Sequence, residues 1–174
     1  TELSKYICFY YELELRDESY HAFPSGNNVV CIFEKANVSY KDDCISIKED
    51  SNYPNTFTAL NKYAKPLQVK TEGHVREFVI IFTPFGLSQF TTKDFTNIPF
   101  FQIDDFKDFF DQNGNFFSQT IETKIKIVEE YLLSKLNEKK ELDIIIQAVH
   151  LLQEEKLNID EIAKELHCSY KKLY

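Results

Sequence analysis

The chain has 174 residues, of which 43% are hydrophobic, so it is long enough and apolar enough to bury a core. Its formal net charge of -8 at pH 7 argues against a chain that grips nucleic acid by itself, because such affinity comes largely from Lys and Arg placed against phosphates. The early apolar stretch over residues 6–11 is too short to cross a membrane and nothing resembles a signal peptide, so we expect a soluble, cytoplasmic protein with no membrane partner.

Residues that commonly carry catalysis or bind metals are scattered along the chain. No Cys or His pair has a recognised metal-ligand spacing, and there is neither a G-x-S-x-G motif nor a glycine-rich phosphate loop. We therefore expect a protein that is not an enzyme, with no catalytic residues, no metal site and no cofactor. The cysteines are interpreted as reduced thiols that mostly pack in the interior; they are Cys8, Cys31, Cys44 and Cys168.

The first hundred residues alternate between short runs of β-branched and aromatic residues and segments with turn chemistry. The runs predict strands at 6–15, 29–34, 56–60, 67–70 and 74–82, with breaks at 24–28, 41–43, 49–54 and 71–73. Short strands at this spacing are typical of an antiparallel β-sandwich or a small cupin-like barrel.

The segment 74–82 is the strongest predicted strand, because its far end is apolar on both faces and should therefore be central in the sheet. Arg76 alternates along it with Phe78, Ile80 and Phe82, which places a guanidinium beside an apolar interior. Arg76 is thus a candidate anchor for an anionic ligand. The alternative, which we favour, is a solvated strand end or a local ion pair.

Phenylalanines are concentrated after this strand, since twelve of the sixteen lie between Phe78 and Phe117. Such density predicts short helices that are held on a sheet by aromatic rings, because each ring buries much area for few ordered torsions. A pocket for a lipid or an aromatic ligand is the alternative to a plain core, which we favour.

Two helices are predicted in the following segment. Over 120–139, apolar residues are spaced alternately four and three apart, and they are Ile121, Ile125, Val128, Leu132 and Leu136. This spacing suits packing against a partner helix, and the sequence leaves open whether the partner lies in the same domain or in a second subunit. The helix over 142–155 is nearly apolar along its middle and is expected to be buried on most sides.

The C-terminal residues have the pattern of a helix-turn-helix. The apolar residues Ile159, Ile162, Ala163 and Leu166 share one face of a short helix. Asn158 and Glu161 have the spacing of a capping box at its start. His167, at the turn, tolerates a left-handed backbone better than most residues do.

Ser169 can then cap a second helix that opens with Tyr170, Lys171 and Lys172. In a DNA-binding helix-turn-helix, residues at the start of the second helix meet base edges and phosphates in the major groove. The alternative is an ordinary helical hairpin that closes a domain.

Taken together, this order of parts resembles the AraC/XylS type of bacterial transcription regulator. Phe23-Pro-Ser-Gly26 before 29–33, and Phe82-Thr-Pro-Phe-Gly-Leu87, are similar to the family's proline-glycine turn and F-x-P-x-G-L segment. Residues 143–152 and 157–174 are similar to the start of its DNA-binding domain. His167 stands where the family commonly has glycine, which affects the expected geometry of the turn.

The resemblance implies an α+β protein in three parts. Residues 1–119 would form a β-rich sensor domain, 120–140 a linker or dimerisation helix, and 141–174 the truncated N-terminal part of a DNA-binding domain. The family has two helix-turn-helix units, and we expect the second to follow residue 174 in a longer protein.

In this interpretation the DNA-contacting residues are Ser169, Tyr170, Lys171 and Lys172. The implied partners are DNA for the full-length protein, with weak or no binding by these 174 residues, an unknown small-molecule effector, and a possible second copy in a homodimer. The alternative is a stand-alone small-molecule-binding domain, or a barrel-fold enzyme domain, with a helical cap.

Overall fold

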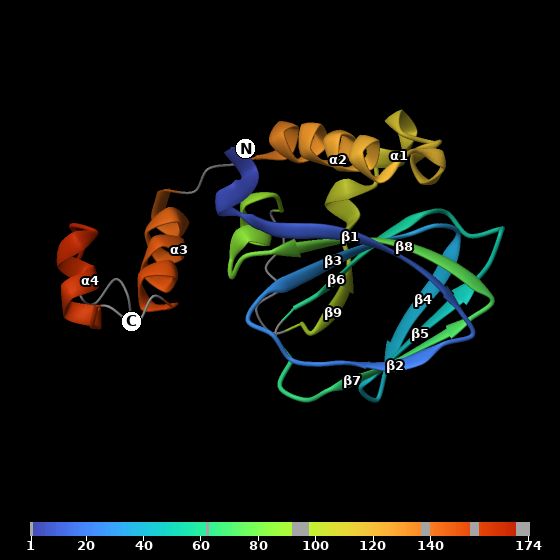
Figure 1. The fold of residues 1–174 in the computed structure, drawn as a ribbon, viewed down its shortest axis with the longest axis horizontal. Helices are drawn as coiled ribbons and strands as arrows, with labels where there is room; N and C mark the ends of the chain where they lie inside the picture. The colour runs from blue at the N-terminus through green and yellow to red at the C-terminus, as the bar shows by residue number, and fades with distance from the viewer. Residues whose placement is uncertain (1, 62, 92–97, 137–139, 154–156, 170–174) are drawn as a thin grey trace.

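The computed structural model describes residues 2–61, 63–91, 98–136, 140–153 and 157–169. Within these ranges the chain is α+β, with two facing β-sheets followed by Phe-rich short helices and then by longer helices (Figure 1). The predicted fold class is confirmed, and of its two variants the observed one is the sandwich-like arrangement.

One sheet has five strands in the order β1-β8-β3-β6-β9, and all its neighbours are antiparallel. Its strands are β1 (Ile7–Arg16), β3 (Asn28–Phe33), β6 (Thr56–Leu60), β8 (His74–Phe82) and β9 (Phe100–Gln102). The other sheet has the order β2-β7-β5-β4, in which β5 and β7 are parallel. Its strands are β2 (Ser19–Ala22), β4 (Ala36–Lys41), β5 (Cys44–Glu49) and β7 (Leu67–Glu72).

Strand β8 is central, as its composition predicted. It pairs with β1 on one side and β3 on the other, and every residue from Glu77 to Phe82 is buried. Because successive side chains point to opposite faces, Phe78, Ile80 and Phe82 join one core while Val79 and Ile81 join another. The five-stranded sheet therefore separates two hydrophobic layers.

The five strands predicted from composition are observed, but β2, β4, β5 and β9 were missed. β4 and β5 form a hairpin with alternating burial, closed by Asp42 and Asp43 at φ of 51° and 59°. A two-residue turn with both φ values positive matches the twist of the adjoining strands. The missed signal was the period-two alternation on either side of a turn that was itself predicted.

The first hydrophobic layer, which we call the aromatic layer, lies between the five-stranded sheet and the short helices. These helices are 3-10 turns at Gly86–Gln89, Asp104–Phe106 and Phe116–Ser118, and α1 (Phe109–Gln112). Rings meet edge to face across it, for example Phe57 and Phe109 with centroids 5.2 Å apart. Most of the phenylalanine-rich segment is thus plain core, as favoured above, with Phe106, Phe109 and Phe116 fully buried.

The segment 82–87 depends on a close approach of two backbones. A Cβ built on Gly86 would lie 2.3 Å from the carbonyl oxygen of Tyr6, so only glycine fits there. Thr83 adds a backbone hydrogen bond of 2.8 Å to the same carbonyl. These contacts join the end of β8 to the start of β1.

Helix α2 (Ile121–Lys135) begins at Thr120, whose hydroxyl accepts a hydrogen bond from the Thr123 backbone. Its predicted apolar seam packs against the aromatic layer of its own domain, with Val128 and Leu132 buried and Ile121, Ile125 and Leu136 packed beside them. The question left open by the sequence is therefore answered within this chain, since the seam lies on the sheet side.

Helices α3 (Lys140–Gln153) and α4 (Ile159–Glu165) lie beside each other at one side of the sandwich (Figure 1). The prediction that α3 is buried on most sides is wrong for its described side chains. Only Ala148 is buried among them, and Leu152 is 45% exposed. The physical reason is that α3 packs mainly against α4, which covers one side of it.

The start and end of α4 confirm the predicted local chemistry. The Asn158 side chain accepts from the Glu161 backbone at 3.1 Å, and the Glu161 carboxylate accepts from the Asn158 backbone at 2.8 Å. At the other end His167 is left-handed, with φ 49°, and Cys168 donates to the carbonyl of Ala163. This is the Schellman arrangement, in which histidine occupies the position that glycine usually takes.

Candidate ligand-binding site

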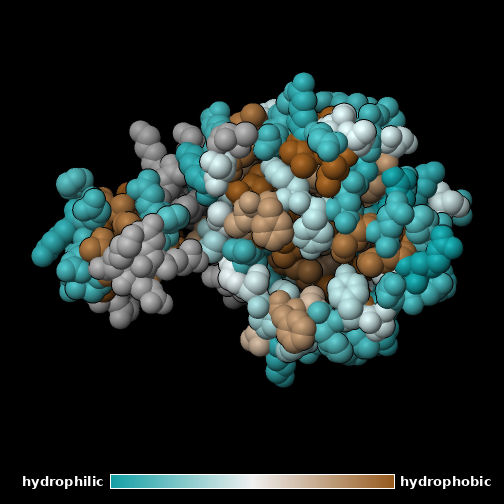
Figure 2. All heavy atoms as spheres, in the orientation of Figure 1, coloured by the Kyte–Doolittle hydropathy of each residue, from teal (hydrophilic) through white to brown (hydrophobic). Residues whose placement is uncertain are grey.

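A cavity of ≈ 270 Å³ lies between the two sheets, on the face of the five-stranded sheet opposite the aromatic layer. It is lined by side chains from eight strands and the loops beside β2 and β6, namely Tyr11, Leu13, Tyr20, Ala22, Phe23, Ser25, Val29, Cys31, Phe33, Ile45, Ile47, Thr58, Leu60, Tyr63, Val69, Glu77 and Phe100. Figure 2 shows hydrophobic side chains near the middle of the side of the sandwich that is turned to the viewer, with hydrophilic ones around them. We call this space the inter-sheet cavity.

Glu77 is the one carboxylic acid among the described residues that line the inter-sheet cavity. It is 5% exposed, and its Oε2 atom has no hydrogen-bond partner in the described part of the chain. Burial raises the pKa of Glu77 to about 7, and a hydrogen bond with the Cys31 thiol opposes this rise. The carboxyl is therefore poised between its neutral and ionised forms near neutral pH.

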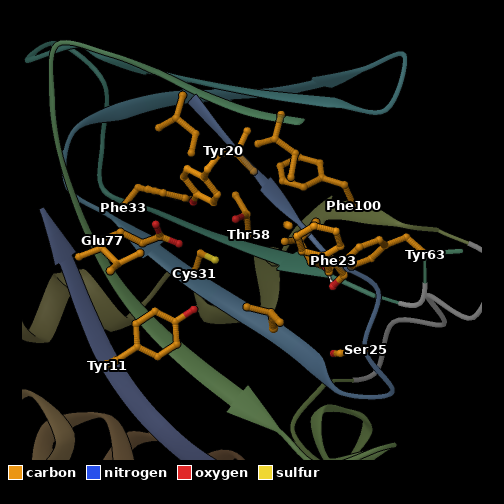
Figure 3. Close-up of a pocket in the computed structure, with 17 residues that line it drawn as sticks. Tyr11, Tyr20, Phe23, Ser25, Cys31, Phe33, Thr58, Tyr63, Glu77 and Phe100 are labelled. Carbon is orange, nitrogen blue, oxygen red and sulfur yellow. Dashed lines mark hydrogen bonds between the residues drawn. The ribbon is translucent and has the colours of Figure 1, made fainter. Parts of the chain in front are cut away.

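The strand register explains which polar groups surround Glu77. Val79 pairs with Tyr11 on β1 and with Cys31 on β3, and Cys31 pairs in turn with Thr58 on β6. Glu77 lies two residues from Val79 on the same face, so it is diagonal to Tyr11 and Cys31. Figure 3 shows the polar ends of Glu77, Cys31 and Thr58 directed into one part of the cavity.

Tyrosine rings contribute the remaining polar atoms. Burial, together with the charge of Glu77 and the Cys31 thiol, raises the pKa of Tyr11 to about 12 and that of Tyr20 further. Both phenols therefore stay neutral and keep their protons at physiological pH. The hydroxyl of Tyr63 already donates a hydrogen bond within the protein, to the backbone carbonyl of Phe23 at 2.7 Å.

Aromatic rings form the other part of the cavity, where Phe23, Tyr63 and Phe100 lie close together (Figure 3). Phe23 is 71% exposed, which is unusual for so large an apolar side chain and places it at the mouth. The ring of Phe100 stacks on the ring of Tyr40, with their centroids 5.7 Å apart. The cavity thus has a polar end at Glu77 and an aromatic end at Phe23.

Arg76, the sequence-based candidate, lies on the other face of the sheet and does not line this cavity. Its guanidinium donates to Glu34 at 2.8 Å and to the carbonyl of Phe117, and it lies 3.6 Å from Glu14. The geometry is that of the local ion pair favoured above. Its neighbours are carboxylates, which compete with any anionic ligand for the guanidinium.

Of the four predicted DNA-contacting residues, Ser169 is exposed and follows the left-handed turn at His167. Tyr170, Lys171 and Lys172 lie outside the described residues. The recognition helix and its contacts therefore both stay predictions.

Sequence reasoning missed Glu77, although a signal was present. Along 74–82, Glu77 alternates with Val75, Val79 and Ile81, so a lone acid shares a face with aliphatic residues. Arg76 is the charged residue on the opposite face. A charge on an otherwise aliphatic face of a central strand is the less common arrangement and the more informative one.

Strand β1 connects the inter-sheet cavity to helix α2. Tyr11 and Leu13 line the cavity, whereas Tyr10 and Glu12 point to the opposite face. Tyr10 donates to Glu129 at 3.3 Å and Glu12 pairs with Lys124, both on α2. The Lys124 side chain is only 3% exposed, so this ion pair is a buried attachment of the helix to the strand.

No group of three or more His, Cys, Asp or Glu residues with the geometry of a metal site occurs in the described part of the chain. Among the same residues, no helix is both long and apolar enough to span a bilayer. Comparison of this chain with protein-family models, curated proteins and solved structures finds no match.

Proposed function

We propose that this chain is the effector-binding part of an AraC-type transcription regulator, followed by the first helices of its DNA-binding domain. The observation that carries the proposal is the inter-sheet cavity, a mostly apolar space with a few convergent polar groups. Strand β1 lines this cavity with one face and binds helix α2 with the other. The capped α4 and its left-handed turn support the DNA-binding part. A cytoplasmic location follows from a function on DNA.

Strand β1 is the proposed route from effector to reader. A ligand that moves Tyr11 or Leu13 also moves Tyr10 and Glu12, because neighbouring residues of one strand share a rigid backbone. Those residues hold α2 through Glu129 and Lys124. A shift of α2 changes the position of the helices that follow it, which is how a bound molecule would bias DNA binding.

In the DNA-bound state Ser169 caps the recognition helix, and Tyr170, Lys171 and Lys172 contact phosphates or base edges. The exposed Leu152 of α3 supports the presence of a further helix that would cover it. A homodimer is expected to use a surface other than the α2 seam, since that seam packs on its own sheet.

The first test is the coding sequence beyond Tyr174. The proposal expects the reading frame to continue the recognition helix and to encode a second helix-turn-helix about fifty residues further on, as this family's organisation implies. A stop codon directly after Tyr174 would contradict it.

The second test is a DNA mobility-shift measurement on two lengths of the protein. Residues 1–174 are expected to bind operator DNA weakly or not at all, and a chain extended through the second helix-turn-helix to bind it with nanomolar affinity. Lys171→Ala in the extended chain should weaken binding and lower its salt dependence by about one counterion. Tight, sequence-specific binding by residues 1–174 alone would refute the proposal that DNA affinity depends on the residues after Tyr174.

A stand-alone binding or enzyme domain is the second candidate, and one observation favours it. A buried carboxyl with a pKa of about 7 suits general acid-base catalysis. The neighbouring Cys31 adds no nucleophile, because burial and the charge of Glu77 raise the pKa of its thiol well above the usual range. Turnover of a bound small molecule that is lost in Glu77→Gln would favour this candidate.

A further inference from the structure

We propose that the inter-sheet cavity binds a small aromatic amine as its cation, with the carboxylate of Glu77 as the counter-ion and the ring of the ligand at the Phe23 end. The proposal rests on the proposed function in one respect, namely that the cavity is the effector site. It names the chemical class of that effector.

Glu77 is a buried acid that has no positively charged side chain beside it among the described residues of the cavity. Oε2 of Glu77 is buried without a hydrogen-bond partner in the described residues, and no Lys, Arg or His belongs to the described lining of the cavity. Buried charges are normally paired, because leaving an ionised carboxylate alone in an apolar site is costly. A cationic ligand supplies the partner that the protein does not.

Among the described residues, the buried charged side chains are those of Glu77 and Lys124. Lys124 is equally buried, yet it has Glu12 as a partner and the rings of Phe116 and Phe117 at 5.9 and 5.7 Å. The fold therefore does pair a buried charge where it has no ligand to bind. Glu77 is the exception, and it faces the cavity.

The aromatic side chains in the wall of the cavity also favour a cationic ligand. Rings of Tyr11, Tyr20 and Phe33 are among its lining near Glu77, and an organic cation is attracted to the face of such rings. An anionic ligand would meet the Glu77 carboxylate and no positive side chain. A neutral ligand would form one hydrogen bond but would not neutralise the acid.

The volume of the cavity also fits a small aromatic amine. A cavity of about 150 Å³ with apolar walls is enough to hold benzene. The inter-sheet cavity, at ≈ 270 Å³, has room for one ring and a short chain. With the ring beside Phe23 and Phe100, the chain leads to Glu77 at the polar end (Figure 3).

The pH dependence of binding follows from the groups that face Glu77. They are Tyr11 from β1, Tyr20 from β2, Cys31 and Phe33 from β3, Thr58 from β6, and aliphatic residues of β5 and β7. The phenols and the thiol have raised pKa values and stay neutral, so Glu77 alone changes charge between pH 6 and pH 8. Affinity for an amine should therefore rise about ten-fold from pH 6 to pH 8 and then level off.

The experiment is isothermal titration of the chain with three probes of matched shape: 2-phenylethylamine, 2-phenylethanol and 3-phenylpropionate. We expect the amine to bind at least ten-fold more tightly than the alcohol, the carboxylate not to bind, and the amine's affinity to follow the pH profile above. Equal affinity for amine and alcohol, or a preference for the carboxylate, would overturn the proposal.

Glu77→Gln is the informative variant, because it keeps the shape and removes the charge. It should bind the amine no better than the alcohol and lose the pH dependence. Glu165→Gln, an exposed residue of α4, removes the same charge far from the cavity and should leave both unchanged. If Glu77→Gln does not fold, the pH profile of the unaltered protein still decides, since a flat profile contradicts an ion pair with Glu77.

The outcomes also separate this inference from the proposed function. Amine binding together with a reading frame that ends at residue 174 would keep the ligand class and reject the regulator. A second helix-turn-helix in the gene, combined with no preference for amines over the other two probes, would keep the regulator and reject the ligand class.

Discussion

The two faces of the five-stranded sheet are built from the same strands and differ in how they are covered. The face toward α2 is filled by interlocking rings, and its buried cation Lys124 is paired with Glu12. The face toward the second sheet is lined by aliphatic and aromatic residues but keeps a cavity and an unpaired acid. The first face is thus a filled core, and the second leaves the space that the proposed ligand would occupy.

The largest effect should come from removing a ring of the aromatic layer. Phe109 is fully buried and contacts Phe57, Phe116 and Tyr131 at 5.0 to 5.2 Å. Phe109→Ala should lower the free energy of unfolding by about 3–5 kcal/mol, measured by urea denaturation. Phe23→Ala, at the exposed mouth of the cavity, is the matched control and should change it by less than about 0.5 kcal/mol. Similar losses for both variants would remove the distinction between the two faces.

The next effect concerns the unpaired acid. Because the pKa of Glu77 is about 7 in the folded protein and near 4.5 when exposed, the unfolded chain loses this proton first as pH rises. The contribution of Glu77 to stability is therefore full below pH 4.5, falls between pH 4.5 and 7, and is flat above. The loss amounts to about 3 kcal/mol.

Urea denaturation at pH 5, 6, 7 and 8 checks this against Glu77→Gln, in which all other groups titrate as before. The difference in unfolding free energy between the two proteins should shift in favour of the variant as pH rises. A difference that stays constant with pH would show that Glu77 is not desolvated in the folded state.

A smaller loss is expected at the paired charge on the other face. Lys124→Ala leaves Glu12, which is partly exposed and can be hydrated, so we expect a cost of about 2 kcal/mol rather than that of a fully buried orphan. A double-mutant cycle with Glu12→Gln measures the coupling between the two side chains. Additive effects would mean that the ion pair does not hold α2 on β1.

The smallest effect compares two neighbours on β3. Val30 is fully buried in the aromatic layer, and Val29 lines the inter-sheet cavity. Val30→Ile adds a methylene to a filled space and should cost about 1 kcal/mol, whereas Val29→Ile should be nearly neutral or slightly stabilising. Thermal denaturation of the pair, made in parallel, reports the difference. A larger cost at Val29 would mean that the cavity has no free space.

The strands and helices that could be predicted were those with strong local signals. The continuous apolar run in β8, the seam of α2 and the capping box of Asn158 and Glu161 depend on neighbours in sequence, and all three are observed. The short strands β2 and β9 have weak signals of their own, and their pairing with β7 and β6 depends on contacts distant in sequence. The burial predicted for α3 was wrong because composition cannot say whether a helix finds a cover.

By itself, then, the sequence determined the α+β class, the left-handed turn at His167 and the face of β8 on which each side chain lies, since these follow from local periodicity and backbone sterics. Only the tertiary structure decided that Arg76 is held in ion pairs while Glu77 faces a cavity whose described lining holds no positive side chain. The reason is that a charge is neutralised or left alone by groups far away in the chain, and strand pairing selects those groups.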